Sequence, residues 1–228
     1  LIKKSFFNYF IPDRPSKPGS VRSIYIRNYQ ALTAHNKRVG ICTYPSDRIG
    51  LFRIKKLYSF LFYLRSIITE HPEDLRPVPG VAERWEVSPD GRQYTFHLRT
   101  GARWTDGQPV TAADFAASFR RILTPALSAE YANMLYVLRG AEDYHKGRST
   151  DFGTVGVLAL DARTLRLTLE NPAPYFLSLL TNPPWYPVPL AAIARHGAID
   201  RRGNPWTRPE KFVGNGPFLL REWRPHQV

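Results

Sequence analysis

Apolar and polar side chains alternate with the period of a β-strand on either side of residues 88–91. Trp85 and Val87 take alternate positions before this point. After it, the apolar positions are Tyr94, Phe96 and Leu98. Alternate residues of a strand point to opposite faces of a sheet, so each run has one apolar face. Because the Ser-Pro-Asp-Gly sequence of residues 88–91 is typical of a tight turn, the pattern predicts a β-hairpin with one buried side.

The period changes to that of an α-helix after this hairpin. Thr111 and Asp114 have the spacing of a capping box, in which two side chains accept hydrogen bonds from N–H groups at the helix start. The apolar stripe that follows consists of Phe115, Phe119, Ile122 and Leu123. The helix ends at Thr124, because the residue before a proline avoids the helical region. We expect a second helix from Ala129 to Leu138 that ends at Gly140.

Weaker versions of both patterns flank these elements. In chain order, the further expected elements are a loop at residues 77–80, a hairpin of residues 155–160 with 165–169, a short helix opened by Asn171 and Pro172, a helix from Leu190 to about His196, and a strand over residues 218–223. This order of hairpins and helices predicts a mixed α+β domain.

The first 65 residues show neither period. Prolines at positions 12, 15 and 18 interrupt the first stretch, and aromatic residues and lysines are mixed without a clear polar face. Because the local signals disagree, we expect residues 1–65 to be either disordered or foreign to the rest, as a shifted reading frame would produce. The expected organisation is this basic segment, an α+β unit at residues 66–190 and a final segment at residues 191–228.

The formal net charge of +13 is concentrated in the first segment. Residues 1–65 contain 13 Lys and Arg against two acidic residues, a net charge of +11, whereas the remainder carries only +2. A strongly basic chain suggests nucleic acid or an anionic membrane as partner. The near balance of residues 66–228 argues against this for the whole chain. It leaves a basic nucleic-acid or membrane-surface adaptor, acting through residues 1–65, as the alternative function.

Motifs for catalysis, cofactor binding and metal binding are not found in the sequence. Neither a glycine-rich phosphate loop nor a serine elbow occurs, and the six histidines are scattered. The single Cys42 excludes an internal disulfide and has no evident base. Asp106 and Asp114 raise the question of acid–base catalysis, but their positions in a turn and a helix cap favour structural roles. We therefore expect no enzyme, no cofactor and no metal site.

An apolar run at residues 57–64 is the nearest approach to a membrane segment. It falls well short of the roughly 20 residues that span a bilayer. No signal peptide with a basic start, an apolar run and a cleavage site is legible. Because the chain begins at Leu1, we expect it to be a fragment of a longer protein.

The second part of the chain contains several short sequence motifs, here called blocks, in a fixed order and spacing. They are residues 80–91, 94–99, 101–115, 118–121, 128–132, 156–161, 167–176, 187–189 and 215–218. In this order they resemble the solute-binding proteins of the oligopeptide/dipeptide ABC-transporter family, which are bacterial extracellular solute-binding proteins of family 5. One block alone carries little weight, whereas the colinear set over about residues 70–228 is specific.

The resemblance implies a fold like that of periplasmic binding proteins of type II, in the peptide-binding subclass. Residues 66–190 would be lobe Ib, and residues 191–228 would return into lobe Ia. The family's opening acidic-Pro-x-x-Leu-Asp-Pro segment and its second lobe have no counterpart here, which implies an N-terminal fragment. Such proteins close two lobes on a peptide by a hinge motion and hold it largely through its backbone.

The resemblance also implies a function and a site. The chain would be the substrate-binding component of an ABC transporter for peptides. It would act in the periplasm or at the cell surface, as a monomer without nucleic acid, and would deliver an oligopeptide or dipeptide to the permease subunits. Tyr131 matches a family tyrosine that faces the ligand, and its alternative role is a core aromatic on a helix. Trp104 and Tyr175 match family aromatics that are expected to pack in the interior.

Overall fold

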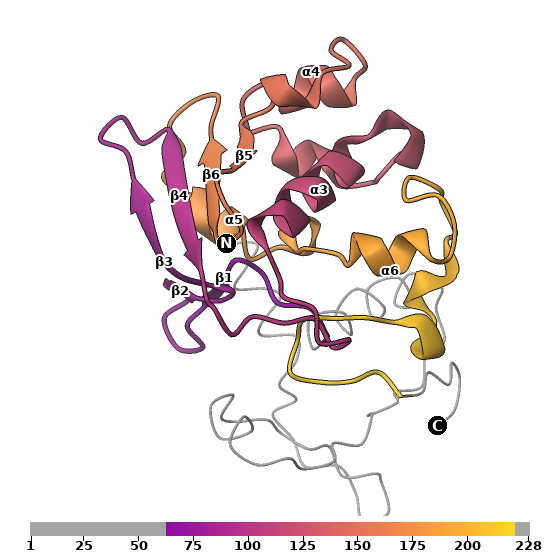
Figure 1. Ribbon diagram of the computed structural model, residues 1–228. Helices are drawn as coiled ribbons and strands as arrows, with labels where there is room; N and C mark the ends of the chain where they lie inside the picture. Colours follow the sequence, from indigo (N-terminus) through magenta and orange to yellow (C-terminus); the bar gives the residue numbers. More distant parts are fainter. Residues whose placement is uncertain (1–62, 222–228) are drawn as a thin grey trace, which may run out of the picture. The chain divides into compact units, whose positions relative to one another are not determined.

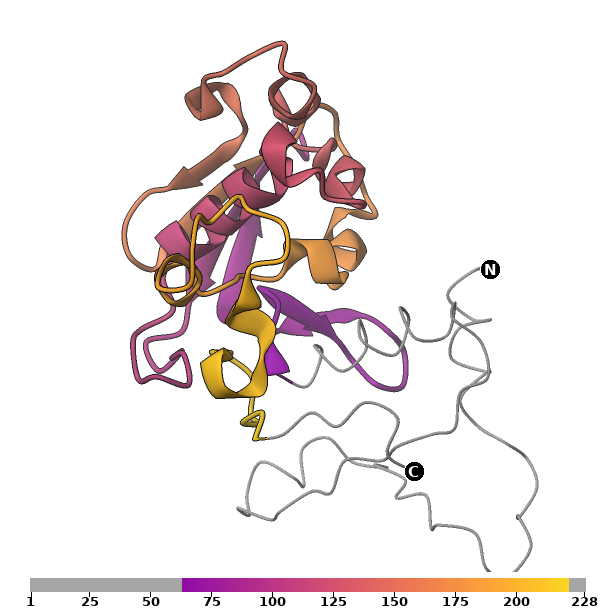
Figure 2. The ribbon, with the colours of Figure 1, turned by 90° about the vertical axis from the view of Figure 1, so that its right-hand side faces the viewer.

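The fold is given by a computed structural model that describes residues 63–221. These residues belong to one compact unit. In it, helices cover one face of a four-stranded antiparallel sheet, and shorter helices and loops complete the unit (Figure 1, Figure 2). The predicted α+β class is therefore confirmed.

The four-stranded sheet consists of the two predicted hairpins placed side by side. β3 (Ala82–Val87) pairs with β4 (Gln93–Leu98), and β5 (Val157–Ala159) pairs with β6 (Thr164–Thr168). β4 and β6 join the hairpins in the strand order β3-β4-β6-β5. All of these pairs are antiparallel, and both hairpins predicted from the alternation are confirmed. The predicted buried side is found in β4 but not throughout β3, where Val87 is 46% exposed.

Helix α3 (Ala112–Leu123) packs against the sheet and supplies the second layer of the core. Its predicted capping box is confirmed: Thr111 Oγ1 accepts from the Asp114 N–H (3.3 Å), and Asp114 Oδ2 accepts from the Thr111 N–H (2.7 Å). The fully buried residues of the two layers include Phe96, Leu165, Leu167, Phe115 and Phe119. The helix stripe and the apolar strand face therefore meet as their periods require.

A two-stranded sheet precedes the hairpins and corrects the loop predicted at residues 77–80. β2 (Pro77–Pro79) pairs antiparallel with β1 (Ile68–Glu70). Prolines lack the N–H that a ladder uses, and such a strand is tolerated at a sheet edge. At Gly80, which follows, a Cβ atom would lie 2.6 Å from the Ser66 carbonyl oxygen, so the close approach of these two segments requires glycine.

The helix predicted over residues 129–138 is wrong. This region instead contains the 3-10 turn η2 (Ala132–Leu135), which is preceded by the 3-10 turn η1 (Pro125–Leu127) and followed by a separate helix α4 (Ala141–His145). A continuous helix is prevented because residues 137–139 pair with the chain around Leu169. Gly140 begins α4, with a positive φ of 65°, rather than ending a preceding helix.

The C-terminal part is built from short helices. α5 (Phe176–Leu179) starts after a proline-rich turn and not at Asn171 as predicted, whereas α6 (Leu190–Ala194) begins where the sequence indicates. The remaining 3-10 helices are η3 (Phe152–Thr154), η4 (Pro183–Trp185), η5 (Pro205–Thr207) and η6 (Pro209–Lys211). The predicted strand is not formed at residues 218–220, and Trp223 lies outside the described residues.

An aromatic cluster joins these short helices to α3. Trp185 is fully buried and contacts Phe119 and Phe176 edge-on, with ring centroids 5.4 and 5.6 Å apart. Phe176 in turn contacts Tyr94 of the sheet at 4.7 Å. Trp185 and Phe176 together therefore connect α3, α5 and the sheet.

The two ends of the described chain are held together by backbone and amide bonds. Asn215 Oδ1 accepts from the Arg65 N–H (2.8 Å), and Asn215 Nδ2 donates to the Arg65 carbonyl (3.1 Å). The Gly216 N–H donates to the Tyr63 carbonyl (2.8 Å). These bonds involve residues 63–65 of the segment predicted to be foreign or disordered. Residues 1–62 lie outside the described range, and the proposed boundaries at residues 65 and 190 remain predictions.

Candidate ligand-binding surface

Tyr131 lies at the start of η2 with its side chain 54% exposed. Behind it, Ala132 and Leu135 are buried and hold the turn against the core. The Tyr131 carbonyl accepts a hydrogen bond from the Met134 N–H (3.1 Å), which fixes the backbone while the ring faces outward. The alternative of a core aromatic on a helix is therefore wrong, and the ring is accessible to a ligand.

The loop before Tyr131 reverses the chain after α3. Thr124 has an extended backbone, η1 follows, and Ser128 then adopts a left-handed conformation with φ 47°. The Ser128 hydroxyl donates to the Pro125 carbonyl (3.2 Å). Because a non-glycine residue seldom takes a positive φ, this turn is a specific feature that sets where η2 begins.

η2 packs against η4, so residues some fifty positions apart meet beside Tyr131. Asn182 precedes η4, and its Nδ2 donates to the Leu179 carbonyl (2.9 Å). The Tyr186 hydroxyl donates to the Thr181 carbonyl (3.2 Å) on the other side of η4. These local bonds hold the half-exposed Asn182–Pro183–Pro184 stretch in place next to η2.

The two aromatics expected in the interior behave differently. Trp104 is buried, at 6% exposure, as expected. Tyr175 is 60% exposed, so the prediction that it packs inside is wrong. Its neighbours Ala173 and Phe176 are buried, and they leave the intervening tyrosine on the outside. Tyr175 is the residue that precedes α5 (Phe176–Leu179), so it lies outside the helix whose buried side holds Phe176.

The candidate acid–base pair has structural partners. Asp114 completes the capping box of α3. Asp106 Oδ1 accepts from the Gln108 N–H (3.2 Å) within its own turn, and Arg195 lies 3.5 Å from Asp106 Oδ2. Both carboxylates are thus engaged in local turns, as the sequence indicated.

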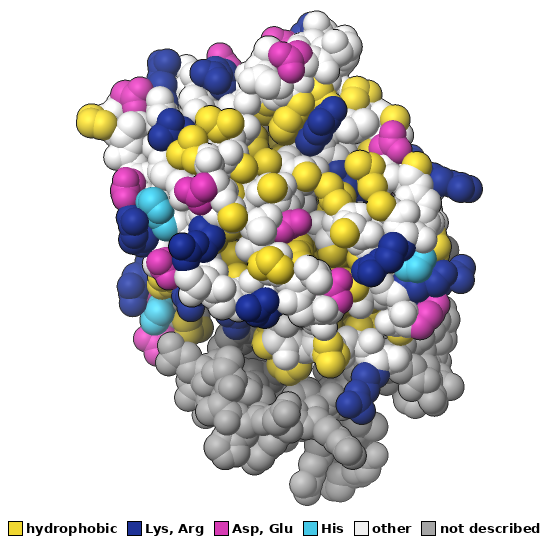
Figure 3. All heavy atoms as spheres, in the orientation of Figure 1, with side chains coloured by type: hydrophobic (Ala, Val, Ile, Leu, Met, Phe, Trp, Pro, Cys, Tyr) yellow, Lys and Arg dark blue, Asp and Glu magenta, His cyan; other side chains and the backbone are white. Residues whose placement is uncertain are grey.

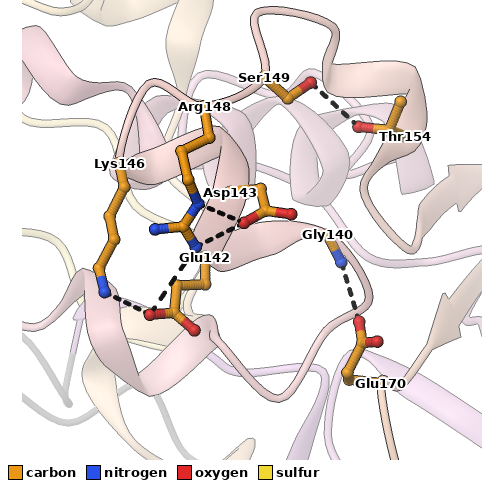
Figure 4. A network of polar contacts seen from close by, with 8 residues as sticks. All are labelled: Gly140, Glu142, Asp143, Lys146, Arg148, Ser149, Thr154 and Glu170. Atoms are coloured by element: carbon orange, nitrogen blue, oxygen red, sulfur yellow. Dashed lines mark hydrogen bonds and ion pairs between the residues drawn. The ribbon is translucent and has the colours of Figure 1, made fainter.

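Charged residues gather on α4 and the loop after it (Figure 4). Lys146 and Arg148 pair with Glu142 and Asp143, and Arg148 Nη2 lies 2.5 Å from Asp143 Oδ1. The hydrogen bond from Lys146 holds the pKa of the Glu142 carboxyl below its usual range. The charges neutralise one another within one short segment, so the cluster is a surface ion-pair network rather than a ligand site.

An open hollow of about 670 Å³ lies beside the junction of residues 65 and 215. Its charged lining residues are Arg65, Glu83, Arg99 and Arg103. Arg103 Nη1 donates to the Gly107 carbonyl (3.0 Å). The hollow is formed by loops other than those that hold Tyr131, and it is therefore not part of the candidate surface.

Other classes of site find no support in the described residues. Within residues 63–221, no group of three or more His, Cys, Asp and Glu side chains could hold a metal ion. In the same range, no helix has both the length and the apolar character needed to cross a bilayer. On the face shown in Figure 3, acidic and basic side chains are interspersed around hydrophobic ones, with no continuous basic area.

A family model described as bacterial extracellular solute-binding proteins, family 5 Middle, matches residues 76–228. The dipeptide-binding protein DppE of Bacillus subtilis is 41% identical over 158 residues, which cover 69% of this chain and 28% of DppE. The periplasmic murein peptide-binding protein MppA of Escherichia coli is 33% identical over 195 residues, 85% of this chain and 34% of MppA. This last alignment exceeds residues 66–228 in length and so reaches into the first segment.

Solved structures share the fold. The crystal structure of Haemophilus influenzae OppA in complex with RPPGFSPFR superposes with a TM-score of 0.65 and 34% identity, over 72% of this chain and 31% of that one. The chain thus spans about a third or less of the length of the proteins it matches. The colinear blocks found in the sequence coincide with the matched range.

Proposed function

Because the chain belongs to the bacterial extracellular solute-binding proteins of family 5, we propose that it is part of the substrate-binding component of an ABC transporter for peptides. In this role it captures an oligopeptide or dipeptide and contributes to its delivery to the permease subunits. The observation that carries the proposal is the match of residues 76–228 to the family, together with the fold shared with peptide-binding relatives.

The proposal extends to location, assembly and chemistry. The chain acts outside the cytoplasm, as relatives named periplasmic do. It works as a monomer without nucleic acid and has no catalytic step, in keeping with the structural roles of Asp106 and Asp114. Residues 66–190 correspond to lobe Ib and residues 191–228 to the return into lobe Ia. The basic-adaptor alternative is supported by none of the matched proteins.

Tyr131 is the proposed ligand contact within this chain. Its ring is exposed on a turn whose backbone is fixed by buried neighbours, so little side-chain freedom is lost when a ligand packs on it. The adjoining Asn182–Pro183–Pro184 stretch widens the surface on which an extended peptide lies.

The test is a binding titration of the full chain. Isothermal titration calorimetry with the nonapeptide RPPGFSPFR and with Ala-Ala should give saturable binding of at least one of them. Tyr131→Ala should weaken that binding about tenfold, whereas Tyr131→Phe, which keeps the ring, should stay within about threefold.

Two outcomes would contradict the proposal, the first its function and the second its site. One is the absence of saturable binding to either peptide. The other is equal binding by Tyr131→Ala and the wild type, which would remove Tyr131 from the site while leaving the transport role in place. A parallel titration with duplex DNA tests the adaptor alternative, since affinity for a polyanion would fall steeply with added salt.

A further inference from the structure

Tyr175 is the most exposed aromatic residue in the described part of the chain that has no assigned role. It is 60% exposed, although its neighbours Ala173 and Phe176 are 5% and 0% exposed. The Phe176 N–H donates to the Ala173 carbonyl (2.9 Å), and the Leu179 N–H donates to the Tyr175 carbonyl (3.1 Å). The backbone is therefore anchored on both sides of a ring that faces solvent, as it is at Tyr131.

The segments that carry Tyr131 and Tyr175 leave the same end of one antiparallel pairing. Leu138 bridges to Leu169, and the Glu170 N–H donates to the Val137 carbonyl (2.9 Å). In an antiparallel pair, the chain before one strand and the chain after the other lie at the same end of the pair. Tyr131 precedes this pairing and Tyr175 follows it, so both lie beyond the same end.

The same two segments also pack against one element, η4. η2, which begins after Tyr131, packs against η4. α5, which begins after Tyr175, contacts η4 through Phe176, whose ring centroid is 5.6 Å from that of Trp185. In Figure 2 the α5 region and the turns after α3 lie on one side of the molecule. The fully buried Trp185 belongs to η4, the element that both segments contact.

We propose that Tyr175 is a second ligand-contacting residue, and that it forms with Tyr131 a pair of aromatic supports for an apolar or aromatic side chain of a bound peptide. The inference rests on the proposed peptide-binding function and deepens it. Tyrosine rings on fixed backbone offer a large contact area at small entropic cost. The surrounding Pro172, Pro174 and Pro183 have no N–H groups, so this surface favours apolar contacts and can offer only carbonyl acceptors from these residues.

The experiment compares three variants of the full chain in the same calorimetric titration with RPPGFSPFR. Tyr175→Ala should weaken binding about 3- to 10-fold, and Tyr175→Phe should stay within about twofold. The matched control is Leu158→Ala, because Leu158 is exposed to a similar degree (53%) but lies on the edge strand β5. It should bind as the wild type does. Replacing the two phenylalanines of the peptide by alanine should abolish the difference between Tyr175→Ala and the wild type.

Folding and function are separated by two readouts. Thermal unfolding of Tyr175→Ala should match the wild type, since the buried Ala173 and Phe176 are unchanged. If the wild type binds the peptide and Tyr175→Ala binds it equally well, this inference is overturned and the proposed function stands. A wild-type chain that binds no peptide would overturn both. An equal loss in Leu158→Ala would also overturn the assignment, because the effect would not be specific to the tyrosine pair.

Discussion

Two regions of this protein are held together in different ways. In residues 82–123, two long strands and the twelve-residue helix α3 make repeated backbone hydrogen bonds, with a capping box at the helix start. In residues 171–217, no helix exceeds five residues, and side chains bond to the backbone instead. Examples are Asn182 to Leu179, Asn204 to Ile193 (3.2 Å) and the Val188 N–H to Ser118 (2.9 Å).

The difference has a consequence for both stability and function. A regular element shares its hydrogen bonds among many equivalent residues, so the loss of one is limited. An irregular segment depends on a few buried anchors and close approaches, each of which holds several neighbours. Tyr131 and Tyr175 both project from irregular segments that pack against η4, the turn that contains Trp185. The proposed ligand surface therefore depends on the region with the fewest repeated bonds.

The largest expected effect comes from the anchor of the irregular region. Trp185→Ala removes a fully buried indole that contacts Phe119 and Phe176, and should destabilise the chain by about 3–5 kcal/mol in urea denaturation. Trp185→Phe should cost much less, because the buried Trp185 Nε1 has no hydrogen-bond partner among the described residues and phenylalanine removes that unpaired donor. If Trp185→Ala lowered the free energy of unfolding by less than about 1 kcal/mol, the irregular region would not depend on this buried anchor.

An intermediate effect is expected where the irregular region meets residue 63. A Cβ atom at Gly214 would lie 2.2 Å from the Tyr63 carbonyl oxygen, so Gly214→Ala forces two backbone segments apart and should cost about 1–3 kcal/mol. Gly101→Ala is the matched control, because no atom lies within 4 Å of the added carbon. It should change the free energy of unfolding by less than about 0.5 kcal/mol. Equal midpoints for the two variants would show that the junction is not a close contact in solution.

The smallest expected effect lies in the regular region. Thr111→Ala removes the hydroxyl that accepts from the Asp114 N–H and should cost about 1 kcal/mol, whereas Thr111→Ser keeps the acceptor and should cost little. Urea denaturation gives the magnitude, and hydrogen exchange of the first-turn amides should be faster only in Thr111→Ala. If Thr111→Ala lowered the free energy of unfolding as much as Trp185→Ala, the regular region would depend on single residues as strongly as the irregular one.

The elements foreseen from the sequence share one property, which is that their signals are local. The turn at residues 88–91 and the box of Thr111 and Asp114 act over a few positions, and the apolar period selects the buried face. The misassigned elements were decided at a distance. The helix expected at residues 129–138 is replaced because residues 137–139 pair with the chain around Leu169, thirty positions later.

For this protein, the sequence by itself determined the α+β class, the two hairpins, helix α3 and, through the order of its blocks, the family. It also pointed to Tyr131. Only the tertiary structure decided that Tyr131 is exposed, that Tyr175 is exposed rather than packed inside, and that both segments pack against η4. The physical reason is that periodicity and turn chemistry act between neighbours in the chain, whereas the exposure of a single ring depends on which distant segments bury the residues beside it.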